Sequence, residues 1–194
     1  TDAFGRIANA SFGDAISPEN YRIANAPVDY PQLWDMWTFD WVQWNGSDQQ
    51  PMARNIGEAL GVGATLAFFD SAGQPLQGDA RYPSSVRVRD LNLIEETLQR
   101  LKPPTWPEAL FGAIDKPLAA RGRALFTENC AACHVPSVSE VNGRPVQQLK
   151  MLAVDYIGTD PGTASNIADQ RYDLSALQWD PAELAQLNVE LHPA

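Results

Sequence analysis

The chain has 194 residues, of which 44% are hydrophobic, and six are tryptophans, so it holds enough apolar surface for one large domain or two small ones. No apolar run approaches the ~18 residues of a membrane helix, and we therefore expect no membrane span. A formal net charge of −10 argues against a nucleic-acid partner, because the phosphates would be repelled.

The first half of the chain begins with a region of weak signals and then a run of tryptophans. Residues 1 to 30 are rich in Gly, Ala and Asn, which predicts irregular structure or short helices. Four tryptophans then recur at spacings of three, four and three and would share one face of a helix, followed by the turn signal Asn45-Gly46. They are Trp34, Trp37, Trp41 and Trp44. A stripe buried in the core is the favoured interpretation, ahead of a functional role for one indole.

Three further elements are predicted before the middle of the chain. Residues 51–63 form a short helix punctuated by glycines, and the runs Thr65 to Phe69 and Val86 to Arg89 form a small antiparallel sheet. Asp90 caps a helix that continues through Leu101. The proline-rich connector 103–115 then separates an N-terminal extension, residues 1–115, from a second domain, residues 116–194.

The most specific signal is Cys130-Ala131-Ala132-Cys133-His134, which uses both cysteines and one of the two histidines. Cys-x-x-Cys-His is the attachment pattern of c-type haem, in which two thiols form thioethers and the next residue's imidazole ligates the iron. One helical turn plus one residue brings the three side chains to one cofactor. Cys130, Cys133 and His134 are therefore predicted to bind one covalently attached haem c, with His134 as an iron ligand.

Other interpretations of the motif are weaker. A Cys130–Cys133 disulfide of the redox type has no use for the adjacent histidine, and no βαβ pattern surrounds it. A zinc site requires about four ligands, and only the distant His192 could add to these three. Chance occurrence of the pattern is the third alternative.

The sequence around the motif supports haem attachment. Pro117 suits a helix's first turn, and Leu118, Gly122, Leu125 and Phe126 share a face that leads to Cys130. At the far end Asp180 and Pro181 begin a closing helix whose leucines include Leu184, Leu187 and Leu191. The intervening residues 135–180 suit loops wrapped around a flat cofactor.

Residues 117 to 191 resemble a class I cytochrome c domain: a first helix with Gly122 and Phe126, the haem motif, wrapping loops and a last helix. The resemblance implies a mainly α fold in which the glycine permits close helix crossing. It also implies that a loop proline carbonyl, best matched by Pro145, accepts the second N–H of the proximal histidine. The chain departs from the pattern in having no aromatic residue on its last helix and no obvious late methionine, which leaves the sixth iron ligand open.

A longer resemblance rests on short segments that include Tyr30 to Asp35, Val42 to Gly46, Arg54 to Glu58, Pro104 to Pro107 and Ile157 to Pro161. With Asp2 to Arg6, these are similar to bacterial dihaem cytochromes of the cytochrome c peroxidase-like group, which is related to the rubber oxygenases. Members of that group carry two haem motifs, whereas this chain has one. The resemblance covers the second-haem half and the insertion before it.

Two classes of function therefore compete. A single-haem electron carrier, alone or within a larger redox protein, is favoured because neither a second haem motif nor a second histidine near the first one is present. The alternative is part of a peroxidase-like or oxygenase-like enzyme, which needs an open sixth position. A structural haem subunit of a larger redox complex is a third, weaker class.

The choice turns on the sixth ligand, for which Met151, His192, Met36 and Met52 are the candidates. Met151 lies in an apolar stretch among the wrapping loops and is the predicted ligand, although a plain core role is an equal alternative. Haem attachment outside the bacterial cytoplasm predicts a periplasmic protein whose leader has been removed. The acidity suits a redox partner with a basic docking surface, or ordinary solubility.

Overall fold

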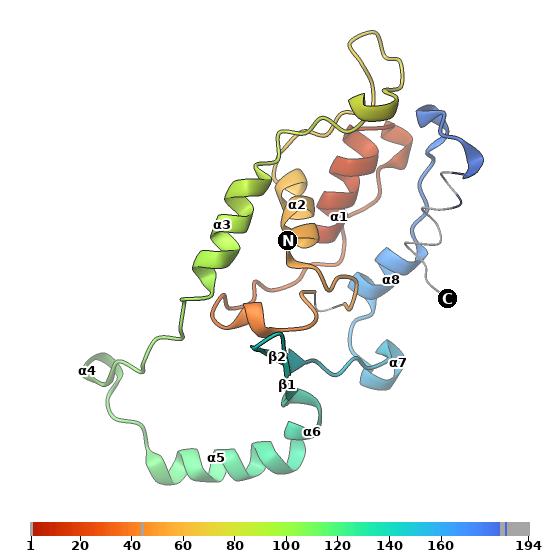
Figure 1. Cartoon of the computed structure of the whole chain (residues 1–194). Coiled ribbons are helices and arrows are strands. Elements are labelled where there is room, and N and C mark those ends of the chain that lie inside the picture. The colour runs from red at the N-terminus through yellow and green to blue at the C-terminus, as the bar shows by residue number, and fades with distance from the viewer. Residues whose placement is uncertain (1, 44, 183–184, 186–194) are drawn as a thin grey trace. The chain divides into compact units, whose positions relative to one another are not determined.

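The computed structural model describes residues 2–43, 45–182 and 185, and it is mainly α-helical with one two-stranded antiparallel sheet (Figure 1). This confirms the predicted fold class. Its helices are α1 (Ala3–Ala8), α2 (Pro51–Gly61), α3 (Val88–Leu98), α4 (Glu108–Phe111), α5 (Lys116–Asn129), α6 (Ala131–His134), α7 (Val154–Ile157) and α8 (Gly162–Asp169), and its strands are β1 (Ser137–Val141) and β2 (Arg144–Gln148). The part of the chain that is described contains no helix with the length and apolar character of a membrane span.

Internal contacts divide the chain into two compact units that alternate along the sequence. Unit 1 contains Thr1–Asp29, Asn55–Arg87 and Gly162–Ala194, and unit 2 contains Tyr30–Arg54 and Val88–Pro161. Each unit draws on both sides of residue 115. The sequence boundary between 1–115 and 116–194 stays a prediction about domains, distinct from these contact units.

In unit 1, α1 and α2 come into close local contact. Gly57 and Gly61, four residues apart on α2, face Ile7 of α1, and a Cβ added at Gly61 would lie 2.9 Å from the Ile7 side chain. Figure 1 shows the two helices side by side. The Arg6 Nε donates a 3.1 Å hydrogen bond to the Gly61 carbonyl, which ties the end of α2 to α1. Small residues on α2 therefore allow the close approach that the bond requires.

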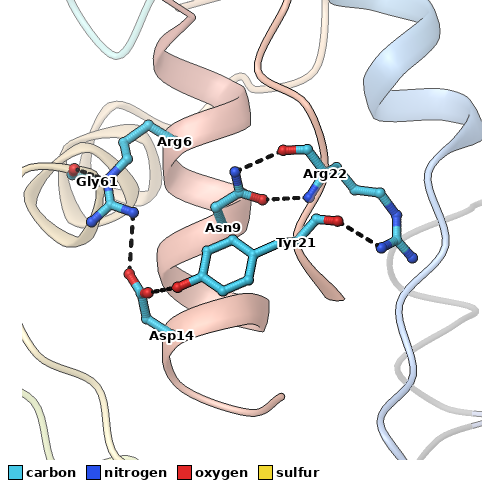
Figure 2. Close-up of polar contacts among 6 residues, drawn as sticks. All are labelled: Arg6, Asn9, Asp14, Tyr21, Arg22 and Gly61. Atoms are coloured by element: carbon cyan, nitrogen blue, oxygen red, sulfur yellow. Dashed lines mark hydrogen bonds and ion pairs between the residues drawn. The ribbon is translucent and has the colours of Figure 1, made fainter. Parts of the chain in front are cut away.

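A polar cluster continues from Arg6 (Figure 2). The Arg6 guanidinium contacts the Asp14 carboxylate at 3.1 Å, and the Tyr21 hydroxyl donates a short hydrogen bond to the same carboxylate. The Tyr21 bond, aided by Arg6, lowers the pKa of Asp14 below its usual value, and the Asp14 carboxylate raises the pKa of Tyr21. Nearby, the Asn9 side chain exchanges two hydrogen bonds of 2.9 Å with the backbone of Arg22. These bonds fix the chain reversal after α1.

The part of unit 1 around Asp173 is anchored by a buried asparagine. Asn20 donates to the Asp173 carbonyl at 2.8 Å and accepts from the Asp173 N–H at 2.7 Å. The side-chain amide of Asn20 thus makes the two hydrogen bonds to the Asp173 backbone that a neighbouring strand would otherwise make. Leu177, which is almost fully buried, lies just beyond it.

In unit 2 the sheet is a hairpin between β1 and β2. Asn142 and Gly143 form its turn, both with positive φ, at 52° and 75°. That is the geometry of a two-residue turn that matches strand twist, and Asn-Gly is its favoured sequence. In the register of the hairpin, Glu140 faces Pro145.

The sheet's position corrects one detail of the sequence prediction. Leu66 makes only an isolated bridge with Ser84, and Phe69 another with Pro75, while Val88 and Arg89 begin α3. The runs 65–69 and 86–89 are therefore not a pair of strands. The periodicity of Leu91, Ile94 and Leu98 favours the helix 88–98, and this helix includes Val88 and Arg89, the second half of the predicted strand.

The tryptophan-rich segment is also different from the prediction. Its only regular structure among the described residues is the 3-10 turn Met36–Thr38, because Asp35 before it has φ of +59° and cannot continue a right-handed helix. Trp34 is exposed, and Trp37 and Trp41 are half-buried, so a four-indole helical stripe is wrong. Trp44 lies outside the described residues. Pro31 and the left-handed Asp35 outweigh the three-four-three spacing.

Candidate functional site

The site is built at the end of α5. The Asp115 carboxylate accepts a 2.9 Å hydrogen bond from the Leu118 N–H and caps the helix, and Pro117 occupies its first turn. α5 ends at Cys130, whose N–H donates to the Phe126 carbonyl at 2.8 Å. The predicted helix leading into the motif is therefore confirmed.

The motif itself is a single helical turn. Cys130 leaves helical geometry, with φ of −125° and ψ of −32°, and α6 begins at the next residue. The Cys130 carbonyl accepts two hydrogen bonds, at 3.1 Å from the Cys133 N–H and at 3.0 Å from the His134 N–H. One carbonyl thus ties the second cysteine and the histidine to the first cysteine.

The two thiols are available for thioether chemistry. Cys130 is half-buried, Cys133 is exposed, and both are free cysteines in the structure. The His134 side chain is exposed as well. Across residues 2–43, 45–182 and 185, no group of three or more His, Cys, Asp or Glu side chains is placed to hold a metal ion. Two thiols and one imidazole within a turn are the donor set of c-type haem.

An apolar surface adjoins this donor set. Leu118, Leu125 and Phe126 on α5 are exposed, and Phe126 stands one turn before Cys130 on the same side of the helix. Val135 and Val138, directly after the motif, are exposed too. A flat, largely apolar porphyrin suits such a surface. The position of the Gly122 Cβ has no heavy atom within 4 Å in the described part of the chain, and most of the expected closing helix, with His192, lies outside that part.

Met151 lies in a segment that contacts the motif. The Lys150 Nζ donates a 3.3 Å hydrogen bond to the Ala132 carbonyl, between the two cysteines. Met151 is 47% exposed, and its methyl group lies against the backbone of Gly46, which has φ of +69°. The structure therefore brings the residue next to Met151 onto α6. Ligation by Met151 stays a prediction.

The other candidate residues lie in different elements. Pro145 is in β2, and no hydrogen bond joins its carbonyl to the His134 ring, both of which are described, so its role stays a prediction. Met36 is in the 3-10 turn 36–38, and Met52 is in the first turn of α2.

Two buried donors lack an acceptor among the described residues. The Trp37 Nε1 and the Asn45 Nδ2 are buried and have no hydrogen-bond partner within the described ranges. Buried donors of this kind usually have acceptors. The residues of the motif itself fit haem through two thiols, one imidazole and the exposed apolar side chains beside them.

Sequence reasoning missed the residues that hold the Met151 segment: Thr38, Asp40, Gly46 and Lys150. The Asn-Gly turn pointed to Gly46, but nothing in the sequence related it to Met151. The hairpin that leads to Met151 was missed as well, although its Asn142-Gly143 pair between alternating apolar residues is a strong hairpin signal.

Comparison with known proteins gives one domain-level result. The family model described as Cytochrome c matches residues 119–187. The chain is 38% identical over 198 residues to "Uncharacterized protein y4iJ" of Sinorhizobium fredii (strain NBRC 101917 / NGR234), a match that covers 89% of this chain and 32% of that protein. It is 28% identical over 149 residues to "Uncharacterized protein y4iM" of the same strain, which covers 77% of this chain and 27% of that protein.

The chain thus spans about a third of the length of the first relative and less of the second. No solved structure matches it. The family match covers α5, the haem motif, the hairpin and the segments after it. Residues 119–187, which contain the Cys130 to His134 motif, therefore match the Cytochrome c family at the level of a domain.

Proposed function

We propose that the protein is a periplasmic electron carrier with one covalently bound haem c, ligated by His134 and Met151. The observation that carries the proposal is the one-turn helix α6, in which the Cys130 carbonyl binds the N–H groups of both Cys133 and His134. The Lys150 contact with Ala132 supports Met151 as the second ligand.

Each residue has a defined chemical role. The Cys130 and Cys133 thiols would hold the haem as two thioethers, each by adding its sulfur and its hydrogen across one vinyl group, so that no leaving group is needed. The His134 ring nitrogen and the Met151 thioether sulfur would hold the iron. Leu125 and Phe126, whose side chains are exposed beside the motif, would supply apolar surface against the cofactor.

Haem iron supplies a reversible one-electron couple between Fe(III) and Fe(II), so an electron taken from a donor passes to an acceptor. Thioether ligation raises the reduction potential, which suits a carrier, and a filled sixth position excludes peroxide and oxygen. The net charge of −10 supports a partner with a basic docking surface, because opposite charges speed encounter.

The alternative proposal is that the chain is part of a dihaem peroxidase-like or oxygenase-like protein. It is supported by the relatives' length, of which this chain spans 32% and 27%, and by the resemblance of its N-terminal segments to that group. In that case the sixth position of the iron is open or displaceable, and substrate reaches it.

One set of measurements on the haem-loaded protein distinguishes the carrier from the enzyme. For the carrier we expect haem that stays with the denatured polypeptide in acidified organic solvent, a low-spin ferric spectrum and no rapid carbon monoxide binding. Met151→Ala should give a high-spin ferric spectrum and rapid carbon monoxide binding, whereas the control Met52→Ala should not. Rapid carbon monoxide binding and peroxide turnover by the wild type would favour the enzyme. If the spin state changes only in His192→Ala, then His192 and not Met151 is the sixth ligand, and the proposal of an electron carrier still holds.

A further inference from the structure

The segment after β2, residues 149–153, has no regular secondary structure, so tertiary contacts must hold it. We call residues 147–151 the Met151 arm. At one point the arm touches the haem motif, through the Lys150 Nζ and the Ala132 carbonyl. All its other hydrogen bonds outside the hairpin, among the described residues, go to a segment far away in sequence, around residues 38–40.

Those bonds form a short continuous ladder. The Gln147 Nε2 donates to the Thr38 Oγ1 at 2.6 Å, and the Asp40 N–H donates to the Gln147 carbonyl at 3.1 Å. The Leu149 N–H then donates to the Asp40 Oδ1 at 2.8 Å. Phe39 also pairs with Gln147 as a parallel bridge. Asp40 therefore binds the arm through both its backbone and its carboxylate.

Thr38, at one end of this ladder, is itself held in place by burial and a second hydrogen bond. The Thr38 side chain is buried, and its hydroxyl donates to the Asp35 carbonyl at 2.6 Å while accepting from Gln147. Thr38 and Asp40 are two positions apart in the sequence, as are Gln147 and Leu149, so the two segments stay in register. A charged acceptor on a partly buried N–H gives a stronger bond than a neutral one.

A third support contacts Met151 itself. The methyl group of Met151 occupies the place where a Cβ of residue 46 would be, and Gly46 has the left-handed φ of +69°. A glycine at this position both permits the turn and admits the methyl group. The side chain of Met151 is therefore confined from the same segment that binds the arm's backbone.

We propose that Thr38, Asp40 and Gly46 are positioning residues that hold the Met151 arm against the haem motif, with Asp40 as the main support. This rests on the proposed ligation by Met151. All three lie outside residues 119–187, the part that matches Cytochrome c. The insertion that contains residues 38–48 thus completes the proposed iron site from outside the residues that match Cytochrome c.

The test compares Asp40→Ala and Asp40→Asn in the haem-loaded protein, with Asp48→Ala as the control. Asp48 lies in the same insertion, and its carboxylate accepts a 2.7 Å bond from Gln50, away from the arm. We expect the amide hydrogen of Leu149 to exchange with solvent about tenfold faster in Asp40→Ala, since its hydrogen bond to a charged group is lost. The reduction potential should fall, and a high-spin ferric fraction should appear. Asp40→Asn keeps a hydrogen-bond acceptor for the Leu149 N–H, so it should restore most of the slow Leu149 exchange, the reduction potential and the low-spin spectrum. Asp48→Ala should change none of these three properties.

Several outcomes would overturn the proposal. Unchanged Leu149 exchange in Asp40→Ala, or an equal change in Asp48→Ala, contradicts a support by Asp40. If Asp40→Ala does not accumulate, Gln147→Ala, which removes the donor to Thr38, tests the neighbouring bond of the ladder. A ferric spectrum and a reduction potential equal to those of the wild type would then contradict support of the arm by the ladder. If Leu149 exchange rises in Asp40→Ala while the spectrum stays the same in both Asp40→Ala and Met151→Ala, the ligand assignment is wrong and the support of the arm remains.

Discussion

The methyl group of Met151 lies where a side chain on Gly46 would begin. The two residues are far apart in sequence, and Gly46 precedes the cytochrome c domain at 119–187. The contact shows that the insertion shapes the surroundings of a residue that we propose as an iron ligand.

Gly46→Ala should disturb the haem iron. The added Cβ would meet the Met151 methyl, and φ of +69° costs a residue with a side chain about 1 kcal/mol. Gly158→Ala is a matched control, because Gly158 has the same φ of +69° and no heavy atom within 4 Å of its Cβ position in the described part. We expect both variants to lower the melting temperature, and Gly46→Ala alone to change the ferric spectrum. Identical spectra in the two variants would show that the contact has no bearing on the iron.

The two cysteines should contribute separate covalent bonds. Cys130→Ser and Cys133→Ser should each retain haem through the remaining thioether, because each thiol is free to react by itself. The double variant should release all haem into acidified organic solvent. Mass spectrometry of the denatured polypeptides measures the attachment directly. Haem retained by the double variant would contradict thioether attachment at this motif.

A nearly buried ion pair should stabilise unit 2. The Arg54 guanidinium of α2 contacts the Glu95 carboxylate of α3 at 2.8 Å, and their side chains are 9% and 13% exposed. Arg54→Met leaves Glu95 without this partner and should lower the free energy of unfolding by about 3 kcal/mol in a urea titration. Arg54→Met combined with Glu95→Leu should recover much of that loss, since both charges of the pair are then removed together.

An exposed pair provides the comparison. Lys102 and Asp35 are 2.6 Å apart, but their side chains are 62% and 38% exposed. Asp35→Asn should lower the free energy of unfolding by less than about 1 kcal/mol, because water screens such a pair. A loss as large as that of Arg54→Met would mean that burial does not control the strength of these pairs.

The pKa of the Asp14 carboxylate should depend on its hydrogen bond from the Tyr21 hydroxyl. Its pKa is lowered mainly by the Tyr21 hydroxyl, with help from Arg6. Its contribution to stability is therefore present above the unfolded pKa of about 3.9 and is lost as the pH falls through the lower folded value. Tyr21→Phe should raise the pKa of Asp14 toward its usual value and reduce this acid-dependent loss.

NMR titration of the Asp14 carboxyl carbon measures this shift. Asp173 serves as the internal control, because its low pKa comes from the N–H and hydroxyl of Ser175 and should not move. An unchanged Asp14 pKa in Tyr21→Phe would assign the shift to Arg6 instead.

Local signals in the sequence were reliable wherever neighbouring residues decide the structure. The Asp115 cap with Pro117 predicted the start of α5, and Cys130 to His134 predicted a helical turn with three donors on it. The glycine-containing helix after residue 50 was predicted as well. Capping, helical spacing and the haem pattern all act within a few residues, so no distant contact is needed to read them.

Predictions failed where two local tendencies conflict. The tryptophan spacing favoured a helix, but Asp35 adopts a left-handed conformation that stops it. Val88 and Arg89 alternate like a strand, but they precede helical leucines and join α3. In both cases a neighbouring element decided the outcome, as is usual when a short pattern is ambiguous.

The sequence by itself determined that two thiols and an imidazole share one helical turn, since that follows from five consecutive residues. Only the tertiary structure decided what lies beside that turn. The bonds of Thr38 and Asp40 to Gln147 and Leu149, and the contact of Gly46 with Met151, join segments separated by about a hundred residues. Such pairings depend on the register and packing of the folded chain, and side-chain types at separate positions do not encode which of them will meet.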